Sequence, residues 1–161
     1  MQSGGAAIEE AELSAPSFDP ADLRGALLET LAAIERDESV APRLRAAGIH
    51  LCLALDEFDD RLEIGPSSEP DEAIAWRFLA IGESPRAGAL ELTMSAEVAN
   101  RWLLGLESLP VAVARGRVRV AGGPTAALAA LPAVRLIAEP YRQLVSSSFP
   151  GLAGGPEPSA S

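Results

Sequence analysis

The spacing of the large apolar residues changes twice along this chain, and that change limits the possible folds more than any other feature. They recur at helical spacing over 23–34, fall on every second residue in several segments between 49 and 94, and return to helical spacing after Ser95. Helical spacing makes one apolar stripe on a helix, whereas alternation makes one apolar face on a strand. The order of helices, strands and helices predicts an α+β fold.

Capping and turn residues place the expected elements. Asp19 followed by Pro20 predicts a helix over about 20–36, because a side-chain oxygen caps free N–H groups and proline fits the first turn. Pro132 is expected to stop a short helix, and Pro140 to kink the last helical region or to start its second half. The other expected elements are a helix from Ser39 to Gly48, strands at 49–55, 61–64, 74–79 and 90–94, a helix capped by Ser95 and ending near Leu106, a helical turn at 109–114, a strand at 116–120, a turn at 122–124, a helix at 125–131 and a helical region at 137–145.

Length and composition predict one domain. The chain has 161 residues, of which 48% are hydrophobic, and this suits a single sizeable core. The ends, 1–17 and 150–161, are rich in Gly, Ser, Pro and Ala and lack periodic large apolar residues. We therefore expect disordered tails on either side of one domain at 18–149.

The charged residues exclude several classes of function. A net charge of -10 disfavours nucleic-acid binding, which depends on basic side chains that replace phosphate counterions. All 13 basic residues are Arg, so lysine Schiff bases and Walker-type phosphate loops are excluded. One histidine and one cysteine cannot form a disulfide or a multi-ligand zinc site, and we expect neither a metal nor a cofactor. Residues 101–161 hold 3 acidic and 6 Arg side chains, so an anionic partner would dock there.

The chain shows no signal-peptide pattern and no run of about 18 apolar residues that could cross a bilayer. We expect a cytoplasmic protein. The abundance of Ala, Arg, Gly and Pro without Lys suggests a bacterium with a GC-rich genome.

Two segments resemble a known family. Leu90-Glu91-Leu92-Thr93-Met94-Ser95 runs into Ala99-Asn100-Arg101-Trp102-Leu103-Leu104-Gly105, and Ala114-Arg115-Gly116-Arg117-Val118-Arg119-Val120-Ala121-Gly122 precedes Ala127-Leu128. A strand that leads into an apolar helix closing on Gly, followed by a Gly-basic-apolar-basic-apolar strand, is similar to the lipid-binding domain of the sterol-carrier-protein (SCP2) family. The resemblance covers about 40–135 and is tightest over 90–130. Gly123 and Pro124 depart from the family pattern, and the C-terminus lacks the peroxisomal signal of eukaryotic relatives.

The resemblance implies a five-stranded, mostly antiparallel sheet covered on one face by helices. It also implies an apolar tunnel between them that binds or carries fatty acyl, sterol or isoprenoid lipids without catalysis. Residues on the covering helices would line that tunnel, although the same stripe could simply fill a core. The predicted ligand-binding residues are Trp102, Leu103, Leu106, Leu109, Val113, Leu128, Leu131, Ile137 and Tyr141.

Charged and reactive residues add weaker hypotheses. Arg115, Arg117 and Arg119 would share one strand face, which could meet an anionic membrane or simply be solvated. The acidic run at 56–60 lacks the ligand pattern of a calcium loop and is expected to be a hairpin tip. His50 and Cys52 face the same way, but no oxyanion-hole motif accompanies them, so both are expected to be structural.

Three functions remain open from the sequence. The first is binding or carriage of a lipid or similar apolar ligand. The second is an accessory protein-interaction domain, for example in quinone biosynthesis or as a ligand-free dimerising module, with a partner protein or a second copy docked on the apolar face. The third, an enzyme using His50 and Cys52, is the least supported, and we expect no enzymatic activity.

Overall fold

The protein is described from a computed structural model, which covers residues 18–47, 50–66, 74–86 and 89–153. The predicted tail at 1–17 and the predicted helix end at Gly48 lie outside these residues. Helix α2 (Pro20–Arg36) has the predicted bounds, and the Asp19 carboxylate accepts a hydrogen bond from the Ala21 N–H at 3.0 Å. Helix α3 (Ala41–Ala47) follows it.

Five strands form one mixed sheet in the order β3-β2-β1-β4-β5. Strands β1 and β4 pair in parallel, and the other three pairs are antiparallel. This is the α+β architecture that the resemblance to the SCP2 family implies. The strands are β1 (Leu51–Leu55), β2 (Arg61–Pro66), β3 (Ile74–Leu79), β4 (Leu90–Met94) and β5 (Arg119–Ala121).

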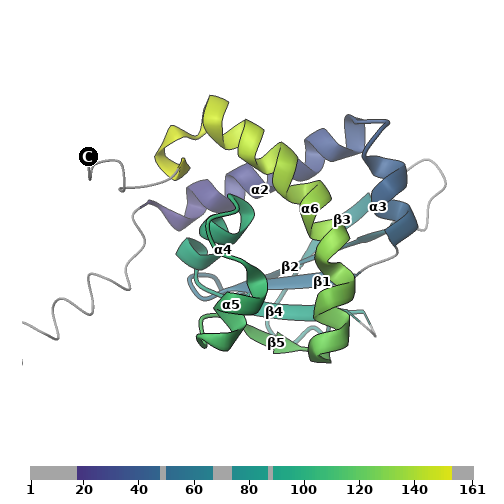
Figure 1. Ribbon diagram of the computed structural model, residues 1–161, viewed down its shortest axis with the longest axis vertical. Coiled ribbons are helices and arrows are strands. Elements are labelled where there is room, and N and C mark those ends of the chain that lie inside the picture. The colour runs from purple at the N-terminus through teal and green to yellow at the C-terminus, as the bar shows by residue number, and fades with distance from the viewer. Residues whose placement is uncertain (1–17, 48–49, 67–73, 87–88, 154–161) are drawn as a thin grey trace, which may run out of the picture.

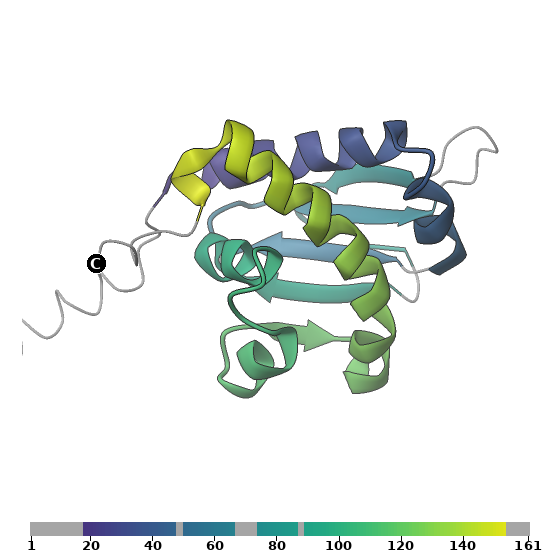
Figure 2. The same ribbon diagram turned by 45° about the horizontal axis from the view of Figure 1, so that its top comes forward.

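One face of the sheet carries the helices (Figures 1 and 2). The alternation seen in the sequence explains this, because the register aligns Leu53 with Leu62 on one side and Leu92 on the other. These three leucines are almost fully buried. The helices therefore cover the apolar face, and the opposite face carries polar residues such as Glu63 and Glu91.

Helix α4 (Ala96–Leu103) begins as predicted, with the Ser95 hydroxyl accepting a hydrogen bond from the Val98 N–H. It ends three residues before the predicted Leu106, because Gly105 takes a φ of +81°, which breaks the helical path. Leu106 thus leaves the face expected for it. Helix α5 (Leu109–Ala114) has the predicted bounds.

The predicted strand at 116–120 is wrong in its first half, because only Arg119–Ala121 pair with β4. Gly116 takes a φ of +75°, which belongs to a turn rather than a strand. The Arg117 side chain instead reaches Glu107 at 2.8 Å. Arg115, Arg117 and Arg119 therefore do not share one strand face.

The predicted break at Pro132 is also wrong. Helix α6 (Gly123–Ser148) begins after Gly122, at the predicted turn, and continues through Pro132 and Pro140. A proline inside a helix costs about 3 kcal/mol. We attribute the continuity to burial, because α6 buries an apolar stripe that spans both prolines. Its members are Ala130, Ala133, Val134, Ile137, Ala138, Tyr141 and Val145.

Helices α2 and α6 lie side by side above the sheet, and α3 also packs on α6 (Figures 1 and 2). The packed chain extends past Phe149 into the predicted tail, where the short 3-10 helix η1 (Pro150–Leu152) buries Leu152. Residues 154–161 of that tail lie outside the described part of the chain.

Candidate functional site

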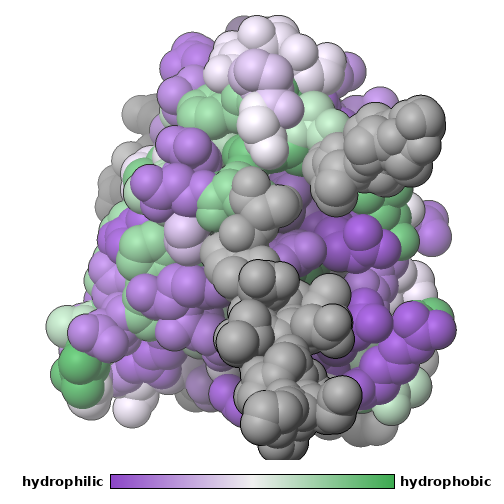
Figure 3. All heavy atoms as spheres, turned by 90° about the vertical axis from the view of Figure 1, so that its left-hand side faces the viewer, coloured by the Kyte–Doolittle hydropathy of each residue, from purple (hydrophilic) through white to green (hydrophobic). Residues whose placement is uncertain are grey.

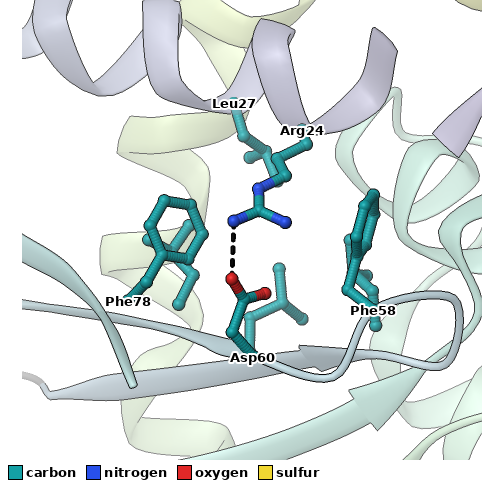
Figure 4. A pocket seen from close by; sticks show the side chains of 8 residues that line it. Arg24, Leu27, Phe58, Asp60 and Phe78 are labelled. Atoms are coloured by element: carbon teal, nitrogen blue, oxygen red, sulfur yellow. Dashed lines mark hydrogen bonds and ion pairs between the residues drawn. The ribbon is translucent and has the colours of Figure 1, made fainter. Parts of the chain in front are cut away.

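A small cavity lies between α2 and the sheet, and Arg24 stands over it (Figure 4). Arg24 extends from α2 toward the hairpin that joins β1 to β2. Its guanidinium pairs with the Asp60 carboxylate at 2.6 Å, and both side chains remain about one-third exposed. An ion pair exposed to this degree contributes about 0–1 kcal/mol to stability.

Two aromatic rings flank the same guanidinium (Figure 4). The central carbon of Arg24 lies 4.0 Å from the ring centre of Phe78 and 4.8 Å from that of Phe58. A cation over an aromatic face gains about 0.5–1 kcal/mol at a partly exposed site. The rings and Asp60 together hold the charge in a fixed orientation at the edge of the apolar layer.

The rest of the cavity wall is apolar. Leu27 closes it from the helix side, and Leu53, Leu55 and Leu62 form its floor on the sheet. Its volume is about 20 Å³, room for about one water molecule. The arrangement thus combines a narrow apolar space with one oriented positive charge.

Sequence reasoning missed this cavity. The only available signals were an arginine three residues before Leu27 in the apolar stripe of α2 and the acidic run at 56–60. That run is a hairpin tip, as predicted, and two of its acids have structural partners. Asp60 pairs with Arg24, and Glu57 accepts a hydrogen bond from the N–H of Ala96 at 2.8 Å.

The predicted ligand-binding residues lie in three different environments. Four of them, Trp102, Leu103, Leu109 and Tyr141, are buried in the core cluster that also contains Leu27, Leu53 and Leu55, and Leu131 packs against it. Ile137 belongs to a second cluster, which is formed by residues of α2, α3, β2 and α6. Leu106 and Val113 are 51% and 38% exposed. The Leu128 side chain lies outside the described part of the structure.

A buried network of two hydrogen bonds connects three elements next to this core. The Tyr141 hydroxyl donates to Asn100 Oδ1 at 2.6 Å, and Asn100 Nδ2 donates to the carbonyl of Leu152 at 3.0 Å. All three residues are at least 94% buried. This network links α6, α4 and η1, and it gives hydrogen-bond partners to the buried Tyr141 hydroxyl and Asn100 amide.

The opposite face of the sheet carries a polar hollow of about 90 Å³, lined in part by His50, Glu63, Arg77 and Arg86. Glu63 is buried, and its carboxylate accepts hydrogen bonds from Arg77 Nε at 2.9 Å and from the Arg86 N–H at 2.6 Å. Burial acts to raise the pKa of Glu63, but these two bonds and the positive charges of Arg77 and Arg86 together outweigh it and lower the pKa overall. The carboxylate is therefore already occupied in fixing the segment between β3 and β4.

Neither candidate nucleophile-base residue is activated. Burial raises the pKa of the Cys52 thiol, which is the opposite of what a nucleophilic cysteine needs. Burial, aided by Arg86, lowers the pKa of His50 despite the nearby Glu63. Within the residues that the structure describes, no group of three His, Cys, Asp or Glu side chains could hold a metal ion, and no helix could span a membrane.

Comparisons with known proteins found no matching family model and no matching curated protein. Among solved structures, the chain is similar to a protein described as "UbiJ-SCP2 Ubiquinone synthesis protein", at 17% identity and a TM-score of 0.48, over 76% of this chain and 94% of that one. It is also similar to the stereoselective inverting sec-alkylsulfatase Pisa1 from Pseudomonas sp., at 11% identity and a TM-score of 0.47. That match covers 60% of this chain but only 14% of the alkylsulfatase.

Proposed function

We propose that this domain binds an amphiphile without transforming it, holding the apolar part between α2 and the sheet and the anionic head on Arg24. The observation that carries the proposal is the oriented guanidinium at the edge of an apolar cavity. A carboxylate or phosphate head would take the place of Asp60, because each can present two anionic oxygens to the guanidinium fork. This narrows the broader lipid hypothesis to ligands with an anionic head.

The cavity has to open for such a ligand, since about 20 Å³ holds one water molecule and no acyl chain. Releasing Asp60 from Arg24 costs little, because the exposed ion pair is worth about 0–1 kcal/mol, and the ring contacts that orient Arg24 are kept. Burying a methylene group returns about 0.8 kcal/mol, so one or two of them offset the lost ion pair. The deeper part of the ligand would then lie along the cluster that contains Trp102 and Tyr141, as the sequence predicts.

The proposal includes that the protein does not catalyse a reaction of its ligand. It is supported by the raised pKa of the Cys52 thiol and by the existing partners of Glu63, which leave neither group prepared to act as a nucleophile or base. Affinity would come from apolar burial, and selectivity from the single charge.

A pair of probes with one chain and two heads tests the proposal. The delipidated protein is titrated with a fluorescent fatty acid and with the corresponding alcohol, while the emission of Trp76 and Trp102 is followed. We expect saturable one-to-one binding of both probes and tighter binding of the acid. Arg24→Gln should bring the acid to the affinity of the alcohol, a loss of about tenfold to a hundredfold, since hydrogen bonds to charged groups contribute about 1.5–3 kcal/mol.

Arg36→Gln is the matched control, because Arg36 is an exposed arginine at the other end of α2. Equal losses in the Arg24 and Arg36 variants would reduce the effect to net charge and contradict the assignment. If the folded protein binds neither probe, the core is closed. The alternative from the sequence, an accessory interaction domain, would then be favoured.

A further inference from the structure

We propose that the segment around α5 docks this protein on the surface of an anionic lipid bilayer. We define the α5 surface as the exposed apolar residues Leu106, Pro110, Val111, Val113 and Ala114 with the four arginines Arg101, Arg115, Arg117 and Arg119. This surface lies apart from the cavity under α2, and the inference does not depend on the proposed ligand.

The outer side of α5 is apolar throughout. The helix consists of Leu-Pro-Val-Ala-Val-Ala, and only Leu109 and Ala112 face the core. Val111 and Val113 are left 42% and 38% exposed, and Leu106, just before the helix, is 51% exposed. Single exposed apolar residues are ordinary on a protein surface, but larger apolar patches mark interaction sites, and four exposed apolar residues lie in this one short helix. On the side of the molecule seen in Figure 3, hydrophobic and hydrophilic residues are interspersed.

The segment that carries this apolar group is positively charged. Residues 101–122 contain four arginines and one acid, Glu107, which gives them a net charge of +3 within a chain of -10. Glu107 is buried and is shared by Arg101 at 3.4 Å and Arg117 at 2.8 Å, and these arginines still leave 44% and 43% of their side chains exposed. An anionic leaflet would attract this surface and repel the acidic remainder of the chain, which would orient the protein.

A bilayer fits this surface better than a protein does. In a two-fold dimer the surface would face a copy of itself and bring eight arginines together, because such an interface is made by the same patch on both chains. Hot spots of protein interfaces are enriched in Trp, Tyr and Arg; the α5 surface has Arg but no Trp or Tyr, and its Leu and Val are under-represented among hot spots. Short aliphatic side chains with arginines in the same segment instead suit the boundary between acyl chains and phosphates.

Co-sedimentation with vesicles tests the proposal on the full chain. We expect binding to vesicles of equal parts phosphatidylcholine and phosphatidylglycerol, weakening with added salt, and little binding to phosphatidylcholine alone. The double variant Arg115→Gln/Arg119→Gln should lose about 25-fold in affinity, at about fivefold for each basic residue near the surface. Arg36→Gln/Arg43→Gln removes the same charge from exposed positions on α2 and α3 and should lose much less.

A substitution at an apolar position tests the apolar part of the α5 surface, with a control that adds the same charge elsewhere. Val111→Asp should reduce vesicle binding about tenfold or more, because it removes an aliphatic contact and adds a repelled charge. Ile81→Asp is the matched control, since Ile81 is 76% exposed and lies after β3, outside the α5 surface. Thermal unfolding of each variant checks that the fold is kept. Equal binding by the two Asp variants, or no binding by the wild type, would overturn the proposal. A dimer that Val111→Asp dissociates would reassign the surface to self-association.

Discussion

Tyr141→Phe should destabilise this protein more than the loss of one hydroxyl usually does. The Tyr141 hydroxyl donates to Asn100 Oδ1 at 2.6 Å in a region that water does not reach. Phenylalanine keeps the ring and its packing, but it leaves that oxygen without its donor. The perturbation therefore isolates one buried hydrogen bond between α6 and α4.

The expected loss is about 2 kcal/mol, because a buried acceptor left unsatisfied costs about 1–3 kcal/mol. In a chain of this length, that corresponds to a fall in Tm of about 4–8 °C. Ser147→Ala is the control on the same helix, since the Ser147 hydroxyl is exposed and bonds to the nearby carbonyls of Gln143 and Leu144 and to the Ser148 hydroxyl. We expect its effect to stay within about 0.5 kcal/mol.

Urea unfolding followed by far-UV circular dichroism measures the difference, and its pH dependence adds a second criterion. Burial raises the pKa of Tyr141 above its usual value of 10. The unfolded state therefore loses the Tyr141 proton first, and wild-type stability should fall as the pH rises above 10. Tyr141→Phe lacks this proton, so the two stabilities should converge. A Tyr141→Phe protein as stable as Ser147→Ala at neutral pH would refute this account of the buried network.

Three further predictions concern the buried Glu107 and Cys52 and the partly buried His50. Glu107→Ala should lower the free energy of unfolding by about 1–3 kcal/mol in urea titrations, because Arg101 and Arg117 lose a shared acceptor but can return to water; no change would mean that the pairs contribute nothing. Because the pKa of His50 is lowered from 6.5, the unfolded state takes up its proton first, so stability should fall as the pH drops below 6.5, and His50→Gln should flatten that slope. Cys52 should resist thiol reagents in the native protein and react on unfolding, and rapid native labelling would contradict its burial.

The sequence predicts local structure well where one short-range signal dominates. The bounds of α2 follow from Asp19, Pro20 and the leucine stripe, and strands β1 to β4 follow from alternation. The prediction fails at Pro132, where tertiary burial outweighs a local preference against helix. It also fails at 116–118, where Gly116 turns the chain and Glu107 holds Arg117.

The candidate site was harder to predict from the sequence than the helices and strands, for a physical reason. Arg24 and Asp60 are 36 residues apart, and no periodicity indicates that a helix surface and a hairpin tip will meet. The predicted apolar residues identify the helices that cover the sheet, but periodicity does not distinguish a core residue such as Trp102 from an exposed one such as Val113. That distinction depends on which side of each helix faces the sheet.

The packing of α2 against α6 has a consequence for the order in which the chain can fold. Ile34 and Leu144 line the same groove between these helices. The apolar stripe of α2 can therefore be buried only after residues about a hundred positions later in the chain have been synthesised. The nascent chain exposes that stripe throughout this interval, when aggregation competes with folding. Pairing of β1 with β4 is also non-local, because β2 and β3 lie between them in the chain, and non-local pairing slows folding. Truncation before α6 should therefore yield an insoluble product rather than a stable smaller domain.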